Sequence, residues 1–152
     1  MPQSLGSVSG KGGSAGIWFA KPGQTVNAQV YRELLKEKLL PFIEIHQVQH
    51  FLQDGAPYHA AKSVQIWLRD SNISVIGPWP GSSPDLNPIE NLWVSMKRRV
   101  AQRNPTSSDE LIACVKDVWV KEINPELCKT LARSMPRRIA AVLAAKGLHT
   151  KY

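Results

Sequence analysis

The chain has 152 residues, a length that can bury one ordinary core. Of these residues 43% are hydrophobic, and five are tryptophan. We therefore expect one globular domain, residues 1–152, and exclude an intrinsically disordered chain. No apolar run reaches the length of a membrane span and no signal-peptide pattern opens the chain, so we expect no membrane partner. The net charge of +7 favours a polyanionic partner, although a basic balance alone is a weak signal.

Two short strands joined by a glycine-rich turn are predicted near the start of the chain. Apolar residues gather at 5–8 and at 17–20, with several glycines between them. Glycine clusters are typical of turns because glycine adopts backbone angles that other residues avoid. A helix is then predicted over residues 28–40, with Asn27 as its N-cap. Pro41 is expected to end this helix, because proline lacks the backbone N–H that a helix interior needs.

A buried strand is predicted over residues 48–54, and its uncharged run ends abruptly in Asp54. An acidic residue at the carboxyl end of a strand in an α/β sheet faces the crevice where such folds bind ligands. Asp54 is therefore a candidate ligand, but local sequence favours a residue that starts the following turn through an Asx-type hydrogen bond. A helix over residues 59–70 and a short strand over residues 73–76 are expected to follow.

Residues 83–93 read as a turn that begins a helix. Asn87 suits the N-cap, Pro88 the first helical position and Glu90 the third, which approximates a capping box. Along residues 91–103, apolar side chains recur on one helix face. The other face is basic and carries Lys97, Arg98, Arg99 and Arg103. Glu90 therefore lies at the start of a helix that is buried on one side and basic on the other.

The last third of the chain is predicted to be helical. Residues 106–110 form a helix-start signal, and Asn124 followed by Pro125 forms another. A break near Pro136 is expected to divide the final helical stretch in two. The two cysteines, Cys114 and Cys128, lack the spacing of a metal site, so we expect buried free thiols.

Two stretches of this sequence resemble a known family. Residues 83–93, SPDLNPIENLW, look like the signature of the Tc/mariner-type DDE transposases. Residues 51–59, FLQDGAPYH, resemble the strand end that carries the second catalytic aspartate of the same family. The resemblance implies an α/β, ribonuclease H-like fold, with a mixed sheet flanked by helices. It also implies an ancestral reaction in which DNA strands are cleaved and transferred, with metal, during DNA transposition and integration.

The resemblance further assigns roles to particular residues. Asp54 and Glu90 would be catalytic residues and metal ligands, and Lys97, Arg98, Arg99 and Arg103 would face DNA. Mg²⁺, or Mn²⁺, would be the cofactor, because hard oxygen ligands suit it and two ions about 3.5–4 Å apart can clamp the attacking and leaving oxygens. Transposon ends and target DNA would be the partners, a homodimer is one possible assembly, and the location would be nuclear.

The local sequence also allows less specific interpretations of the same residues. Glu90 could be only a capping-box glutamate, and Asp85 is expected to be a turn residue with no metal role. His59 is expected to pack against or cap the start of the next helix rather than act in catalysis. The basic helix face could be a solvated surface or could neutralise phosphates, in which case its binding would weaken with salt.

The chain departs from the family pattern at its beginning. The family's catalytic triad starts with an aspartate on the first strand, whereas this chain has no aspartate before Asp54 and no acidic residue before Glu33. We therefore expect an N-terminally truncated catalytic domain whose first strand is missing, with no useful transposase activity by itself. The alternative is a non-catalytic DNA-binding or interaction module derived from a transposase.

Overall fold

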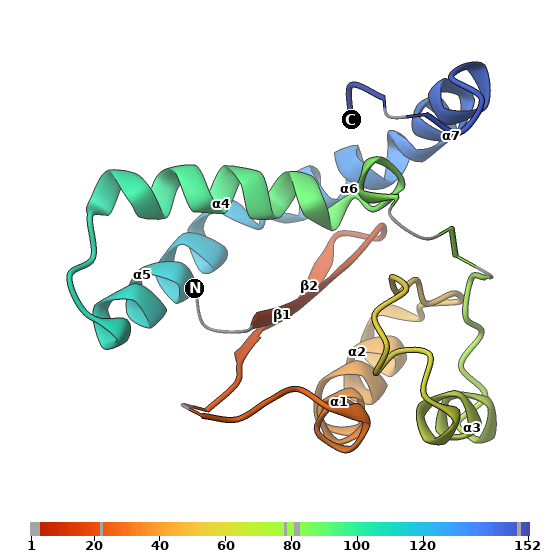
Figure 1. The fold of residues 1–152 in the computed structure, drawn as a ribbon, viewed down its shortest axis with the longest axis horizontal. Coiled ribbons are helices and arrows are strands. Elements are labelled where there is room, and N and C mark those ends of the chain that lie inside the picture. The colour runs from red at the N-terminus through yellow and green to blue at the C-terminus, as the bar shows by residue number, and fades with distance from the viewer. Residues whose placement is uncertain (1–3, 22, 78, 81–82, 149) are drawn as a thin grey trace. The chain divides into compact units, whose positions relative to one another are not determined.

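The computed structural model describes residues 4–21, 23–77, 79–80, 83–148 and 150–152 (Figure 1). Its elements, in chain order, are β1 Ser4–Ser9, β2 Gly13–Phe19, α1 Ala28–Leu34, a π-helical segment Leu35–Leu39, α2 Leu40–His46, α3 Lys62–Asp70, a 3₁₀ turn Pro84–Leu86, α4 Ile89–Arg103, α5 Ser108–Glu122, α6 Pro125–Arg133 and α7 Met135–Ala144. Backbone contacts divide the chain into two compact units. The first comprises Met1–Ser4 and Phe19–Ser82, and the second comprises Leu5–Trp18 and Ser83–Tyr152.

The strands β1 and β2 form a two-stranded hairpin, which confirms the two strands predicted at this end of the chain. Gly12 has a φ of +90° in the turn, and its N–H donates to the carbonyl of Ser9 at 3.0 Å. A left-handed residue in a tight turn favours glycine, which has no Cβ to clash. The backbone angles of the turn therefore explain why glycine occurs there.

In the second unit the hairpin packs closely on α5. The indole N–H of Trp119 donates to the Ser14 hydroxyl at 2.9 Å. At Gly6 the backbone lies so close to Trp119 that an added Cβ would come within 2.5 Å of the ring. The rings of Trp93 and Trp119 lie 5.6 Å apart, within the range of favourable aromatic pairs. These contacts join the hairpin to the helices of the second unit.

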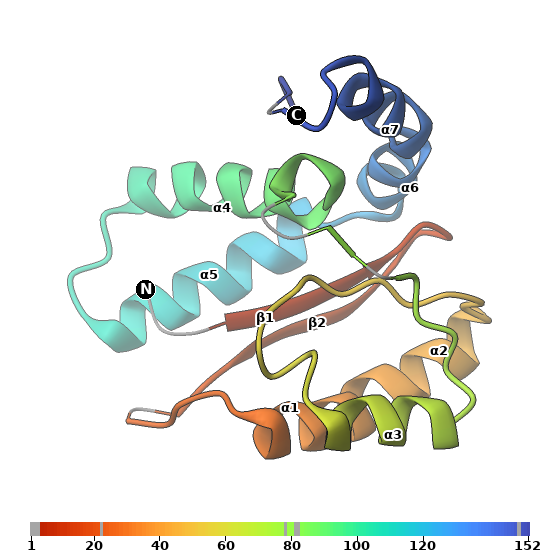
Figure 2. The ribbon, with the colours of Figure 1, turned by 45° about the vertical axis from the view of Figure 1, so that its right-hand side comes forward.

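The helices α4 and α5 run side by side in this unit (Figure 2). Their buried side chains are Leu92, Met96 and Val100 from α4, and Val115, Val118 and Trp119 from α5. The predicted helix starts are confirmed, because the Ser107 side chain accepts from the Glu110 N–H and the Asn124 side chain accepts from the Leu127 N–H. The predicted break is also confirmed, with Pro136 in the first turn of α7.

In the first unit, the helix that begins after Asn27 continues beyond its predicted end. Asn27 caps α1 as expected, but helical backbone extends through Pro41 to His46. A proline removes one N–H donor and crowds the carbonyl four residues earlier. The preceding residues, Leu35–Leu39, take a wider π turn in which the Leu40 N–H reaches the Leu35 carbonyl. The predicted stop at Pro41 was wrong because this widened turn accommodates the proline.

The two strands predicted in this unit are reduced to one parallel bridge between Phe51 and Val75. The Phe51 N–H donates to the Ser74 carbonyl at 2.7 Å, and the Ile76 N–H donates to the Phe51 carbonyl at 2.8 Å. The prediction was wrong for the remaining residues of 48–54 and 73–76. A strand needs a neighbour along its whole length, and no further strand pairs with either segment in the described part of the chain.

The helix predicted over residues 59–70 begins at Lys62, because the residues before it form a turn. In that turn the N–H groups of His59 and Ala60 donate to the Ala56 carbonyl, at 2.9 and 3.2 Å. The core of this unit contains Tyr31, Leu35, Leu39, Phe42, Val64 and Leu68, all of them buried. No helix among the described residues combines the length and the apolar character that a membrane span requires.

Candidate active site

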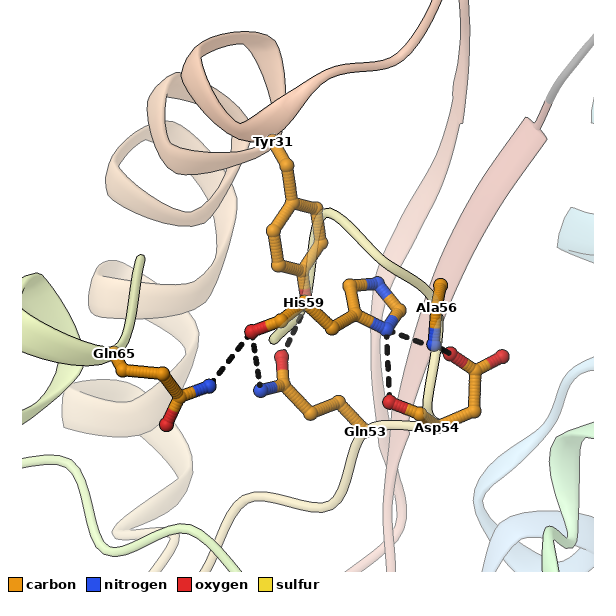
Figure 3. Close-up of polar contacts among 6 residues, drawn as sticks. All are labelled: Tyr31, Gln53, Asp54, Ala56, His59 and Gln65. Carbon is orange, nitrogen blue, oxygen red and sulfur yellow. Dashed lines mark hydrogen bonds and ion pairs between the residues drawn. The ribbon is translucent and has the colours of Figure 1, made fainter. Parts of the chain in front are cut away.

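Asp54 lies in the first unit, three residues after the bridge at Phe51, and its side chain is 51% exposed. Its Oδ1 accepts from the Ala56 N–H at 3.0 Å and lies 2.6 Å from Nδ1 of His59 (Figure 3). No hydrogen bond or ion pair of Oδ2 is found among the described residues. Asp54 therefore forms the predicted Asx-type turn through Oδ1. Its second carboxylate oxygen is left for another ligand.

His59 is buried beside Asp54 and contacts two tyrosines. Its ring centre lies 4.3 Å from that of Tyr31 and 4.5 Å from that of Tyr58. Its Nδ1 also lies 3.1 Å from the carbonyl oxygen of Asp54, whereas the buried Nε2 contacts no hydrogen-bonding group in the described ranges. His59 does pack near the start of α3, as expected, but its polar contacts are with Asp54.

The backbone of His59 is held from two sides. Its carbonyl accepts from the amide of Gln65 on α3 at 2.6 Å and from the amide of Gln53 at 3.5 Å (Figure 3). The Tyr31 hydroxyl on α1 donates to Oε1 of Gln53 at 2.9 Å. Burial raises the pKa of Tyr31, with Tyr58 and Asp54 adding to the effect, so the Tyr31 hydroxyl stays a donor.

The 83–93 motif lies in the second unit as a 3₁₀ turn followed by α4. Asn87 has extended backbone angles, and its side chain accepts from the Ile89 N–H at 3.4 Å. Pro88 has helical angles, and regular helix begins at Ile89, one residue later than predicted. Glu90 lies half-buried in the first turn of α4.

A buried arginine that the sequence interpretation missed holds this motif on both sides of Glu90. Arg138 on α7 is 2% exposed and donates to the Asp85 carbonyl at 2.9 Å and to the Asn91 side chain at 2.6 Å. The Asp85 carboxylate accepts from the Thr150 hydroxyl at 3.1 Å. One signal was present in the sequence, since Met135, Arg138 and Val142 share one helix face. Asp85 therefore anchors the motif to the last residues of the chain.

The basic face of α4 divides into two pairs of side chains, all of them exposed. Arg99 pairs with Glu122 at 3.2 Å, and Arg103 pairs with Asp117, so both join α4 to α5. For Lys97 and Arg98, no ion pair is found within the described residues. Of the four predicted DNA-facing residues, Arg99 and Arg103 thus form ion pairs with α5, whereas Lys97 and Arg98 form none with the described residues.

Asp54 belongs to the first unit and Glu90 to the second, and each is defined within its own unit. Their convergence on one metal site stays a prediction. Within the ranges that the structure describes, no group of three or more histidine, cysteine, aspartate or glutamate side chains could hold a metal ion. Both cysteines are free thiols as expected, with Cys128 buried and Cys114 half-buried.

Comparison with known proteins identifies relatives along nearly the whole chain. The Tcb2 transposable-element transposase of Caenorhabditis briggsae is 31% identical over 160 residues, covering 97% of this chain. The Tcb1 transposase of the same organism is 35% identical over 130 residues, covering 84% of this chain. The matches span 58% of Tcb2 and 47% of Tcb1, so the chain corresponds to about half the length of these relatives.

Solved structures of the Mos1 transposase have the same fold. The Mos1 catalytic domain solved with raltegravir and Mg superposes with a TM-score of 0.83 at 26% identity, covering 97% of this chain and 76% of that one. The Mos1 mariner paired-end complex with Mn gives a TM-score of 0.84 at 25% identity, covering 97% of this chain and 44% of that one. These similarities confirm the predicted α/β, ribonuclease H-like fold.

The sequence pattern that defines the DDE superfamily endonuclease family matches residues 5–112, well over half of the chain. This range contains both Asp54 and Glu90, in the two stretches that carry the resemblance to Tc/mariner-type transposases. The chain therefore belongs to the family of DDE superfamily endonucleases, as part of a transposase catalytic domain.

Proposed function

We propose that this chain supplies two metal-binding carboxylates, Asp54 and Glu90, to a DDE-type reaction in which DNA strands are cleaved and transferred. One observation carries the proposal. Asp54 is fixed by the Ala56 N–H and His59, and only one of its oxygens is used in that way. An exposed carboxylate that is held by one oxygen, with no hydrogen bond or ion pair found between the other oxygen and the described residues, suits a ligand for a cation, and the family resemblance gives it that role.

The carboxylates fit Mg²⁺ or Mn²⁺, because both ions prefer oxygen ligands and keep several waters. Mos1 structures have been solved with Mg and with Mn. When bound, the metal would stabilise the negative charge on the oxygens of the scissile phosphodiester. In this proposal Asp54 and Glu90 would hold the metal, and the Ala56 N–H and His59 would hold Oδ1 of Asp54.

DNA is the proposed substrate and partner. The Mos1 relatives include a strand transfer complex and paired-end complexes. On this chain, the net charge of +7 supports attraction to phosphates, as do the exposed Lys97 and Arg98, for which no ion pair is found with the described residues. A second copy of the chain, as in a paired-end assembly, is part of the proposal.

Binding of Mn²⁺ to the purified chain tests the proposed ligands. The isosteric changes Asp54→Asn and Glu90→Gln each remove one negative oxygen and should weaken Mn²⁺ binding at least tenfold, measured by calorimetry. Glu44→Gln is the matched control, because Glu44 is an exposed acid on α2 without an ion pair among the described residues. Equal affinities for all three variants would contradict the proposal.

A second candidate function is a DNA-binding module without catalysis. The observation that favours it is the exposed pair Lys97 and Arg98, which could neutralise phosphates without a metal. DNA binding that persists in EDTA and survives Glu90→Ala, together with Mn²⁺ binding that does not depend on Asp54, would favour this function. Mn²⁺ binding that is lost on Asp54→Asn would favour the first.

A further inference from the structure

We propose that His59 is a positioning residue for Asp54, donating a hydrogen bond from Nδ1 that fixes one carboxylate oxygen and leaves the other for a divalent cation. This inference rests on the proposed function, in which Asp54 binds metal. It concerns a residue that was expected to pack against or cap the next helix, and the contacts of its ring suggest the new role.

The surroundings of the ring decide which nitrogen carries the proton. Nδ1 faces two acceptors, the Asp54 carboxylate at 2.6 Å and the Asp54 carbonyl at 3.1 Å, so it must be a donor. Nε2 is buried and faces no acceptor in the described residues, so a proton there would be left without a partner. The geometry therefore assigns the hydrogen-bonding proton to Nδ1.

The ring has little freedom to turn away from Asp54. Tyr31 and Tyr58 contact it at centroid distances of 4.3 and 4.5 Å. Its backbone carbonyl is held by the Gln65 and Gln53 amides (Figure 3). Because the donor itself is fixed, the hydrogen bond can set the orientation of the Asp54 carboxylate.

The effect on the carboxylate follows from its two oxygens. Oδ1 receives both the Ala56 N–H and the His59 Nδ1–H, which uses its two lone pairs. Oδ2 is then the oxygen that remains for a cation. Without the histidine donor, the side chain of Asp54 would keep only the turn hydrogen bond and could rotate. Hydrogen bonds that orient metal ligands typically change metal affinity about 10–100-fold when they are removed.

Two substitutions separate positioning from packing. His59→Asn places an amide N–H close to the position of Nδ1, whereas His59→Gln places its amide near Nε2 and leaves Asp54 without the donor. Both replace the ring by a polar side chain, so both lose the same aromatic contacts. Mn²⁺ affinity of the full chain is the measurement, with Glu44→Gln as the control for general loss of charge.

We expect His59→Gln to weaken Mn²⁺ binding about tenfold and His59→Asn to stay within about threefold of the parent chain. Equal weakening by both variants would show that the ring acts by packing alone and would overturn the inference. Unchanged affinity for His59→Gln, with weakening for Asp54→Asn, would overturn the inference and leave the proposed function intact. Unchanged affinity for Asp54→Asn would overturn both.

A second measurement on the unmodified chain does not depend on how well a variant folds. The ¹⁵N chemical shifts of the His59 ring distinguish a protonated nitrogen from a bare one. We expect Nδ1 to be protonated, with a coupled Nδ1–H proton observed in the metal-free protein. The opposite tautomer would overturn the inference, because Nδ1 could then give Asp54 no hydrogen bond.

Discussion

Asp54 shows at the scale of one residue that a confirmed turn interpretation leaves room for the metal-ligand prediction. Local sequence offered an Asx-type turn or a metal ligand, and the structure uses Oδ1 for the turn while Oδ2 stays unpaired among the described residues. The turn was predictable because aspartate before a glycine is a local signal. The contact with His59 was harder to predict, because it depends on the buried setting that Tyr31 and Tyr58 provide.

The hydroxyl of Tyr31 should contribute measurably to stability. Tyr31→Phe removes the donor to Gln53 Oε1 and leaves a buried acceptor unpaired. We expect the free energy of unfolding, measured in urea, to fall by about 1–2 kcal/mol. Tyr58→Phe is the control, because the Tyr58 hydroxyl makes no hydrogen bond within the described residues, and it should change by less than about 0.5 kcal/mol. Equal losses for the two variants would contradict the assignment.

The same tyrosine predicts a loss of stability at alkaline pH. Burial raises the pKa of Tyr31 above the ordinary tyrosine value of about 10, so the folded state favours the protonated form. The stabilisation is complete below pH 10 and should decline as the pH rises above it, because only the unfolded chain readily loses the proton. Urea unfolding between pH 8 and 11 should show this decline, and Tyr31→Phe should reduce it. A decline of the same size in both proteins would assign it to other groups.

At the scale of the elements, helices were predicted better than strands. The caps at Asn27, Ser107 and Asn124 are local signals, and each forms the expected side-chain hydrogen bond. Strand pairing depends on distant segments, so the run ending in Asp54 could not reveal that only Phe51 would be bridged. The predicted end of the helix at Pro41 was wrong for another reason. A π turn accommodates the proline, and no sequence pattern indicated that turn.

Arg138 ties two elements together, and its loss should weaken the start of α4. It connects α7 with Asp85 and Asn91, which flank Glu90. Arg138→Met keeps the length of the side chain but leaves buried acceptors unpaired, so we expect a loss of about 2–4 kcal/mol in unfolding free energy.

The neighbouring Arg137→Met is the matched control for this loss. Arg137 is exposed on the same helix and should change stability by less than about 0.5 kcal/mol. Urea unfolding of both variants measures the difference. Similar stability of the two would contradict the anchoring role of Arg138.

At the scale of the whole molecule, the proposed binding of DNA relies on the net positive charge of the chain. Lys97→Gln with Arg98→Gln should weaken DNA binding and lower the salt dependence by roughly one unit of slope for each lost phosphate contact. Lys36→Gln with Lys38→Gln removes the same charge from the π-helical segment, where both lysines are in ion pairs. Fluorescence anisotropy over a range of salt concentrations measures both. An equal effect of the two double variants would mean that only net charge acts.

The two compact units also mark the limit of what the sequence could predict about the site. The family resemblance placed Asp54 and Glu90 in one metal site, and each residue has a local setting that suits this role. Asp54 sits on a turn held by His59, and Glu90 lies between two residues held by Arg138. The family resemblance pointed to the two carboxylates, whereas the buried side chains that contact the two stretches, His59 and Arg138, could not be found from local patterns.

One measurement tests most directly whether Asp54 and Glu90 bind the same metal. Mn²⁺ is added to ¹⁵N-labelled protein, and paramagnetic broadening is followed at the backbone amides of Ala56 and Asn91, each close in sequence to one carboxylate. We predict that both signals broaden with a single apparent dissociation constant, and that Asp54→Asn weakens both together. Broadening with two different constants, or broadening at Asn91 that Asp54→Asn leaves unchanged, would contradict the shared site.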